Sequence, residues 1–498
     1  MDKRGSGILL HITSLPSPYG IGDLGPEAYR FVDFLSCSKQ SFWQILPLCA
    51  INFPFHISPY LSMSVFAGNT MLISPDWLVQ RGYLEKEELE PVPCFPEGKV
   101  DHSAVHVYKK KLFQKAYSRF KKRRKEENYE KFCAENSGWL EDFSLFISLK
   151  NHYQGKPWIE WPSEIRNKKP AALKKLRKTL QNETEKEKFL QYVFHQQWAS
   201  LRDYCLKNKI RIIGDLPIYT DYDSADVWMH PEIFKLNRKK RPYSVSGVPP
   251  DYFSRTGQRW GNPVYDWPAL KKKGYDWWIH RLEHNFKLYD IIRIDHFRGF
   301  VAYWEVPAAH RTAARGKWIK APAKDFFTKL KKRFPRLPII AEDLGHITSD
   351  VKQVMQQFGF SGMKVLLFAF GKNNPEHPYL PHNYEKNCVV YTGTHDNNTV
   401  RGWFEHEAKS AVKKRIFRYL GCKVSKEEIS WEFIELAMMS VADLVIIPMQ
   451  DVLGLGEVAR MNLPATSQGN WEWKLLPEQL GPELAKRLSE MTEISKRA

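Results

Sequence analysis

The chain has 498 residues, of which 43% are hydrophobic, so it can bury a large core in one to three domains. Its seven cysteines are scattered and never occur as Cys-x-x-Cys, which argues against a disulfide framework and against a structural zinc site. The first residues lack the apolar core of a signal peptide, and no run approaches the roughly 20 apolar residues of a membrane span. We therefore expect a cytoplasmic protein without a membrane partner.

The net charge of +19 raises the question of a nucleic-acid partner. Much of this charge falls in residues 109–131 and 166–188, where the basic runs 121–125 and 174–178 are mixed with glutamates in helix-like sequence. Neither region contains a helix-turn-helix, an RNP motif or a zinc finger. We interpret both as solvated helical faces and expect no nucleic-acid partner, with a non-catalytic basic protein that binds glucan or nucleic acid as a distant alternative. The oligomeric state is not indicated.

In chain order, apolar runs typical of buried strands alternate with amphipathic helical patterns. The helical patterns include 26–35, 277–288, 325–334, 351–358 and 413–420. The eight predicted strands are 6–15, 42–48, 210–215, 291–295, 337–342, 363–370, 388–396 and 444–449.

Eight strands with intervening helices predict an α/β fold, a single (β/α)₈ TIM barrel over residues 1–498. A doubly wound open sheet is the alternative, but no Gly-x-Gly-x-x-Gly follows the first strand. We expect a largely helical insertion at about 50–205 and a second insertion at about 219–290 that carries a cleft-covering loop. The residues after the last strand lack the strand-like runs that a C-terminal β-sandwich domain would need.

Acidic residues end four of the predicted strands: Asp215, Asp295, Glu342 and Asp396. A single acid after a strand is usually a turn former or a helix N-cap. Four acids at the same rim of a barrel would repel one another, so they indicate a functional site for a divalent metal or for glycoside cleavage. No His-Glu-x-x-His spacing supports a metal. The 17 Trp and 22 Tyr favour sugar, because aromatic faces stack on pyranose rings.

Arg293 and Asp295 are two residues apart on a predicted strand, which puts both side chains on one face. The pair is either a structural ion pair or part of a site. In the second case the guanidinium would lower the pKa of Asp295 and keep it ionised. Glu342 follows an apolar run that would desolvate it and raise its pKa.

Motifs along nearly the whole chain resemble the 4-α-glucanotransferase family of amylomaltases and disproportionating enzymes, within the α-amylase clan of retaining glycosidases. Any one motif alone is weak evidence for the family, but their order along the chain is specific to it. They include Ser58-Pro59-Tyr60, Gly214-Asp215-Leu216-Pro217, Arg293-Ile294-Asp295-His296, Ala341-Glu342-Asp343-Leu344-Gly345, Gly393-Thr394-His395-Asp396-Asn397 and Gly469-Asn470-Trp471.

The resemblance implies that Asp295 is the nucleophile, Glu342 the general acid and base, and Asp396 the transition-state stabiliser. It also implies six substrate-binding residues: Tyr60, Asp215, Trp260, Arg293, His395 and Asn462. The implied reaction is transfer of α-1,4-glucan segments from glucan or maltooligosaccharide donors to the 4-OH of glucose or maltooligosaccharides, without metal or cofactor. A hydrolase of the same clan is the alternative.

Two features depart from the family pattern, and a third bears on acceptor binding. Residues 52–57 replace a Gly-rich acidic loop, and Asn398 replaces an acidic residue after Asp396-Asn397. Tyr252 and Phe253, together with Tyr60 and Trp260, are expected to hold an acceptor and displace water. Donor length, acceptor length and the formation of cyclic glucans are not indicated by the sequence.

Overall fold

The computed structural model describes residues 4–52, 57–123, 126–250, 254–466 and 468–498. Eight parallel strands form a sheet in the order β10-β11-β12-β1-β2-β3-β6-β9. Each of the eight predicted apolar runs contributes one of them. The strands are β1 (Gly5–Leu9), β2 (Phe42–Gln44), β3 (Arg211–Pro217), β6 (Ile291–Asp295), β9 (Ile339–Ala341), β10 (Gly362–Val365), β11 (Cys388–Tyr391) and β12 (Leu444–Pro448).

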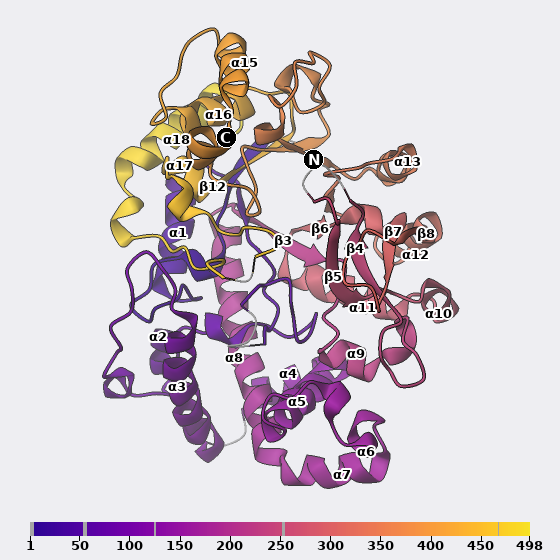
Figure 1. The fold of residues 1–498 in the computed structure, drawn as a ribbon. Helices are drawn as coiled ribbons and strands as arrows, with labels where there is room; N and C mark the ends of the chain where they lie inside the picture. Colours follow the sequence, from indigo (N-terminus) through magenta and orange to yellow (C-terminus); the bar gives the residue numbers. More distant parts are fainter. Residues whose placement is uncertain (1–3, 53–56, 124–125, 251–253, 467) are drawn as a thin grey trace.

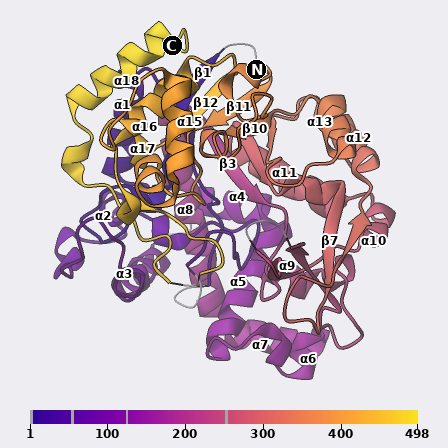
Figure 2. The same ribbon diagram turned by 45° about the horizontal axis from the view of Figure 1, so that its top comes forward.

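The two edge strands of this sheet meet and close it into a barrel. The amide of Ala341, at the end of β9, donates to the carbonyl of Ser361, directly before β10, at 2.8 Å. A parallel bridge joins Ile340 to the same Ser361. All seven other strand pairs are parallel, and long helices surround them (Figures 1 and 2). The predicted (β/α)₈ barrel is therefore confirmed.

Helices follow most strands, and the sequence explains where they begin and end. α1 starts at Pro26, whose fixed φ suits the first helical turn, and α13 ends before Gly359, which adopts φ 73°. The helices among the barrel strands are α1 (Pro26–Cys37), α11 (Asp276–Leu288), α12 (Ala323–Arg333), α13 (Ser349–Phe358), α14 (Val400–Gly402), α15 (Ser410–Leu420) and α16 (Ile429–Met438).

In chain order, a group of helices comes between β2 and β3. These helices extend below the barrel in Figure 1. α8 is the longest of them and returns the chain to β3, packing on α5, α3 and α4. In α7 the basic side chains 174, 175, 177 and 178 are exposed, while Leu173 and Leu176 pack on the core. These helices are α2 (Pro75–Gln80), α3 (His102–Lys122), α4 (Glu127–Glu135), α5 (Ser137–His152), α6 (Ser163–Arg166), α7 (Pro170–Thr179) and α8 (Gln181–Lys207).

A second, antiparallel sheet in the order β5-β4-β7-β8 was not predicted from the sequence. Two of its strands precede β6 and two follow it, so the sheet forms only when segments on both sides of β6 come together. It lies beside the barrel, on the right in Figure 1. Its strands are β4 (Ser244–Val248), β5 (Gln258–Pro263), β7 (Ala302–Pro307) and β8 (Lys317–Lys320), and the short helices α9 (Ala225–Met229) and α10 (Trp267–Lys272) flank β4 and β5 in sequence.

Several strand ends differ from the sequence prediction. β3 continues to Pro217, so Asp215 lies inside the strand rather than at its end. β11 stops at Tyr391, which leaves Asp396 on a loop. That loop is held by a turn in which Asn397 donates its amide to the carbonyl of Thr394 at 3.1 Å and accepts the amide of Thr394 through its side chain at 2.9 Å. Turn chemistry therefore ends the strand earlier than the apolar run suggests.

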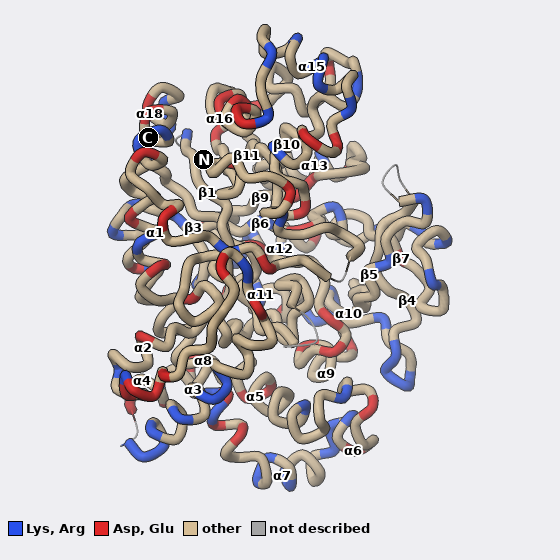
Figure 3. Tube along the Cα trace, turned by 60° about the vertical axis from the view of Figure 1, so that its left-hand side comes forward, with Lys and Arg blue, Asp and Glu red and all other residues tan. Residues whose placement is uncertain are grey.

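After β12 the described residues form α17 (Met449–Val452), α18 (Pro482–Ile494) and short 3₁₀ turns, with no further strand. Arg497 donates to the carbonyl of Gly5 at 3.1 Å, so the two ends of the chain lie close together. Figure 3 shows lysine and arginine spread over α3, α7, α15 and the small sheet. Among the described residues, no helix is long and apolar enough to cross a bilayer, and no three His, Cys, Asp or Glu side chains are grouped to hold a metal ion.

Candidate active site

Arg293 lies in the barrel interior and joins two carboxylates. The strand register places it opposite Asp215 of β3. Its guanidinium donates to Asp215 at 2.6 Å and to Asp295, two residues further along β6, at 3.0 Å. The Asp215 side chain is fully buried, whereas the Asp295 side chain keeps 30% of its surface exposed. Asp215 therefore anchors the guanidinium from the inside, and Asp295 presents its carboxylate at the mouth of the barrel.

Burial raises the pKa of the Asp295 carboxyl, and Asp215, Glu342 and Asp396 add to the rise by like-charge repulsion. The Arg293 guanidinium opposes this rise. The sequence predicted a lowered pKa for Asp295, and that prediction was wrong. Arg293 has the predicted effect, but burial next to three other carboxylates outweighs it.

Glu342 directly follows β9, and two backbone amides orient its carboxyl. The amide of His296 donates to Oε2 and the amide of Leu344 donates to Oε1, each at 2.8 Å. Burial raises the pKa of Glu342, as the sequence predicted, although Arg293 and the two amides oppose the rise. His296 itself adopts a left-handed conformation with φ 50° directly after β6. The ends of β6 and β9 are thus directly linked.

Asp396 belongs to the loop after β11 and is held by two neighbouring side chains. Asn462 donates to Oδ1 at 2.6 Å, and His395 Nε2 lies 3.4 Å from Oδ2. The Asp396 side chain is 43% exposed, so it is available to a ligand. Burial lowers the pKa of His395, which keeps the imidazole neutral near pH 7.

Tyr60 connects Asp215, the partner of Arg293, with His395, the neighbour of Asp396. Its hydroxyl donates to Asp215 at 2.6 Å, and the same oxygen lies 2.8 Å from His395 Nε2. A hydroxyl has one proton, so His395 must donate through Nε2. The Tyr60 ring stacks on His395 at 5.3 Å between centroids, and Trp471 lies 5.9 Å from Tyr60 and 6.0 Å from His395. The three rings form an aromatic wall beside Asp396.

Trp260 contributes an aromatic ring from the antiparallel sheet. It is 37% exposed, and its ring stands perpendicular to His296 at 4.7 Å between centroids. Through His296 it is next to the backbone that orients Glu342. Tyr252 and Phe253, two of the predicted acceptor-holding residues, and residues 53–56 of the atypical loop lie outside the described residues.

Two sets of contacts, joined by the peptide bond between Asp295 and His296, bring together the nine predicted catalytic and substrate-binding residues. They run from Trp260 through His296 to Glu342, from Asp295 through Arg293 and Asp215 to Tyr60, and from Tyr60 through His395 to Asp396 and Asn462. Sequence reasoning missed Trp471 and Arg460. Trp471 was present in a quoted motif without a role, whereas nothing in the sequence around Arg460 signals its contacts.

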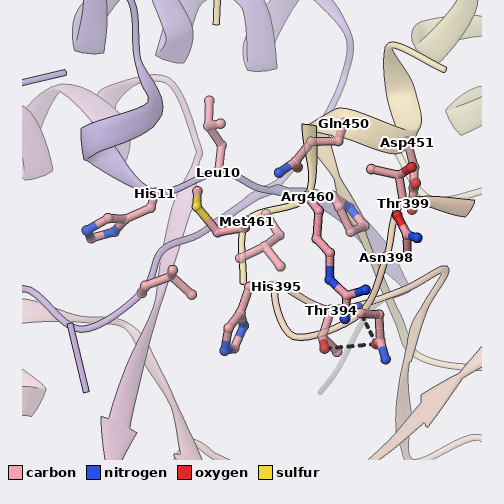
Figure 4. A pocket seen from close by; sticks show the side chains of 14 residues that line it. Leu10, His11, Thr394, His395, Asn398, Thr399, Gln450, Asp451, Arg460 and Met461 are labelled. Carbon is pink, nitrogen blue, oxygen red and sulfur yellow. Dashed lines mark hydrogen bonds between the residues drawn. The ribbon is translucent and has the colours of Figure 1, made fainter. Parts of the chain in front are cut away.

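A small cavity of about 20 Å³ lies behind His395 (Figure 4). His11, Gln450, Asp451 and Arg460 are among the residues that line it. Space for about one water molecule is too little for a sugar ring. The cavity is therefore not a sugar site, and the partly exposed carboxylates of Asp295 and Asp396 do not line it.

A (β/α)₈ barrel with carboxylates at its carboxyl-terminal rim, a glutamate of raised pKa among them, and an aromatic wall has the arrangement of a glycoside-cleaving enzyme. The model of one protein family, described as 4-alpha-glucanotransferase, matches residues 10–479. The chain belongs to this 4-alpha-glucanotransferase family, and it is an enzyme that acts on α-glucans.

The names of similar proteins agree with this assignment. The 4-alpha-glucanotransferase of Aquifex aeolicus is 48% identical over 472 residues, which are 95% of each chain. The 4-alpha-glucanotransferase of Thermus thermophilus is 46% identical over 503 residues, which are 99% of each chain. Among solved structures, the amylomaltase from Streptococcus agalactiae in complex with acarbose superposes with a TM-score of 0.95 over the full length of both chains at 39% identity. The family that the motifs resembled is therefore confirmed, and with it 4-α-glucanotransferase activity.

Proposed function

We propose that the enzyme moves segments of α-1,4-glucans and maltooligosaccharides to the 4-OH of glucose or of another maltooligosaccharide, with Asp295, Glu342 and Asp396 as its catalytic residues. The observation that carries the proposal is the link from Arg293 to Asp295 at the mouth of the barrel, next to Glu342, which directly follows the adjacent strand β9. A carboxylate held by a guanidinium and a neighbouring carboxylic acid of raised pKa are the two groups that a retaining mechanism needs.

The resting site is expected to hold one proton between Asp295 and Glu342, because both pKa values are raised and close carboxylates do not readily ionise together. The guanidinium contacts Asp295 directly, so the negative charge belongs on Asp295 and the proton on Glu342. The two backbone amides then orient the protonated Glu342, since each of its oxygens can still accept a hydrogen bond.

In the first step Asp295 attacks the anomeric carbon, and Glu342 gives its proton to the oxygen of the leaving chain. The product is a glucosyl ester on Asp295 of inverted configuration. In the second step Glu342 takes the proton of the acceptor 4-OH, whose oxygen displaces Asp295 and restores the original configuration. Asp396 accepts hydrogen bonds from ring hydroxyls as positive charge develops on the sugar.

The remaining site residues supply the binding surface. Tyr60 offers an aromatic face for a sugar ring, and His395 is a hydroxyl donor fixed in one tautomer by Tyr60. Trp260 is exposed at the rim, where it can cover a bound chain. Asp215 and Arg293 support Asp295 from within the barrel, and Asn462 supports Asp396.

Maltotriose as the only substrate tests this proposal. Transfer gives glucose and a ladder of longer maltooligosaccharides, with little net gain in reducing ends. Water at about 55 M competes with the acceptor, so transfer requires a bound and oriented acceptor, for which effective molarities of about 10⁵ M are known. If reducing ends rise in step with substrate loss and nothing longer than maltotriose forms, the enzyme is a hydrolase.

A further inference from the structure

Arg460 lies just beyond the site and uses all three of its guanidinium nitrogens. Nε donates to the carbonyl of Asn462 at 2.9 Å, and Nη2 donates to the carbonyl of Asp396 at 3.1 Å. Nη1 pairs with Glu407 at 3.3 Å. Figure 4 shows the side chain extending to the loop that carries Thr394 and His395.

The two carbonyls belong to residues whose side chains also bond to each other. Asn462 donates its side-chain amide to Asp396 Oδ1 at 2.6 Å. Arg460 therefore fixes the backbone at both ends of that bond, and it joins the loop after β11 to the segment after α17. Neither Asp396 nor Asn462 lies in a helix or strand. With a side chain 43% exposed, Asp396 has little packing to hold it in place.

A second set of contacts holds Glu407, the partner of Arg460. Asn398, two residues after Asp396, donates to Glu407 at 2.9 Å and to Glu457 at 3.2 Å. Its side chain is buried. An amide can donate to both glutamates, whereas the carboxylate that is usual at this position in the family pattern could only repel them. These contacts therefore lead from Arg460 through Glu407 and Asn398 back to the loop that carries Asp396.

We infer that Arg460 is a positioning residue for Asp396, with Glu407 and Asn398 as its anchors. The inference rests on the role proposed above for Asp396. Arg460 acts by keeping the Asp396 carboxylate where the developing positive charge of the transition state will be. A stabiliser that acts mainly in the transition state affects kcat more than KM, so misplacing it lowers kcat most.

The first experiment compares R460M, R460K and the control R497M in maltotriose disproportionation. Arg497 also uses three nitrogens, all on backbone carbonyls, but at the opposite end of the barrel strands near Gly5. We expect R460M to lose about 10- to 100-fold in kcat, with a smaller change in KM, because displacements of about 1 Å can cost about 10²-fold. R460K, which retains the charge, should recover part of kcat. R497M should lower the thermal midpoint while kcat stays near the wild-type value.

Equal losses of kcat in R460M and R497M at matched stability would overturn the inference, as would an R460K variant no better than R460M. If R460M does not fold, the variants R460K and E407Q test the inference instead. E407Q keeps a hydrogen-bond acceptor for Arg460 at a site where Glu407 is 46% exposed, so its loss should stay under about fivefold. A fall as large as that expected for R460M would mean that Glu407, not the link to Asp396, is what matters.

A double-mutant cycle with D396N separates this inference from the proposed function. If Arg460 works through Asp396, R460M adds little to the loss that D396N already causes. If the two losses multiply, Arg460 acts by another route and the inference fails while the role of Asp396 stands. If D396N alone retains near-wild-type kcat, the proposed role of Asp396 fails first.

Discussion

Arg293 and Asp295 lie on one face of β6 with 3.0 Å between guanidinium and carboxylate, and the same guanidinium is held from below by the buried Asp215. This relationship limits how far the pKa of Asp295 rises. Burial raises the pKa of Asp295, and Arg293 is the group that limits the rise. Asp295, the proposed nucleophile, thus lies in a poorly solvated position where one cation offsets part of the rise in its pKa.

Replacing Arg293 by lysine should therefore move the acid limb of the kcat/KM profile to higher pH. A lysine reaches one carboxylate at a time, so it opposes the rise in the pKa of Asp295 less well. With a higher pKa, a smaller fraction of Asp295 is ionised at a given acidic pH, and activity falls at a higher pH than in the wild type. The measurement is kcat/KM for maltotriose from pH 4 to 9. A limb that stays in place or moves to lower pH would contradict this prediction.

The thermal stability of R293K must also be measured, and R293M is the variant to compare it with. Arg293 and Asp215 form a buried pair, and removing one partner of such a pair typically costs about 3–5 kcal/mol. R293M should therefore melt well below R293K, which keeps a charge for Asp215. The pH profile is read only at temperatures where the variant is folded, as judged by circular dichroism.

The apolar runs predicted all eight barrel strands, because strands buried on both faces need β-branched and aromatic residues in unbroken sequence. Asp295 and Glu342 could be placed at strand ends for the same reason. The antiparallel sheet could not be found in this way. Its strands are short and partly exposed, as in Lys317–Lys320, and β4 finds its partner β7 only across the whole of β6. Pairing of that kind depends on the assembled fold rather than on local pattern.

The site shows a similar division. Residue type and order along the chain predicted which carboxylates meet, but not the sign of the pKa shift at Asp295, which depends first on its burial and then on the carboxylates around it. Arg460 could not be predicted either. It bonds to the backbone carbonyls of Asp396 and Asn462, and backbone acceptors leave no trace in residue type. The loop conformations that bring those carbonyls together are set by turns such as Thr394 to Asn397.

Substitution of Asp295, the proposed nucleophile, and substitution of Glu342, the proposed acid, should be distinguishable by the leaving group. We expect D295N to lose at least about 10³-fold with both maltotriose and maltosyl fluoride, because no covalent intermediate can form from either. E342Q should lose a similar factor with maltotriose but much less with the fluoride, since fluoride departs without a proton. Initial rates of the first step with each donor provide the test. Equal losses of E342Q on both donors would remove Glu342 from the role of acid.

Binding provides the control for this pair. Neither change removes the aromatic wall of Tyr60, His395 and Trp471, so both variants should still bind maltooligosaccharides with affinities close to that of the wild type. A loss of binding that matches the loss of rate would mean that the substitution had disturbed the site. Near-wild-type turnover by D295N would exclude Asp295 as nucleophile.

Acid should destabilise the enzyme through a pair of packed histidines away from the site. His195 of α8 and His284 of α11 lie 5.8 Å apart between ring centroids, against Trp139 and Phe66. Burial lowers the pKa of His195 to about 3 and that of His284 to about 4. Both stay neutral in the folded chain, whereas the unfolded chain binds protons below about pH 6.5. Stability is thus unaffected above pH 6.5 and falls as the pH drops from 6.5 towards 4.

The fall should be at most about 1.4 kcal/mol per pH unit for each histidine, and it is measured from urea unfolding at pH 7 and pH 5. H284F should unfold with a smaller difference between the two pH values than the wild type. H280F, at an exposed histidine of the same helix α11, should leave the difference unchanged. If H284F and the wild type lose the same stability between pH 7 and pH 5, His284 does not cause the acid sensitivity.

The exposed ring of Trp260 should decide how much of the glucosyl enzyme reaches water. Trp260 stands on β5 against His296, beside the backbone that orients Glu342, and it is 37% exposed. A flat aromatic surface there would hold the acceptor chain and keep water from the ester on Asp295. We expect W260A to form glucose and other reducing ends faster relative to transfer products than the wild type does. W260F, which keeps a ring, should lie in between.

The measurement is the ratio of new reducing ends to elongated products from maltotriose, taken early in the reaction. Y243A is the control, because Tyr243 is another exposed aromatic residue next to the same antiparallel sheet, directly before β4. Its ratio should equal that of the wild type. If W260A loses transfer and hydrolysis in equal proportion, Trp260 helps to bind the donor or to place Glu342 and does not select between sugar and water. An unchanged ratio and rate would mean that the acceptor is held by other residues.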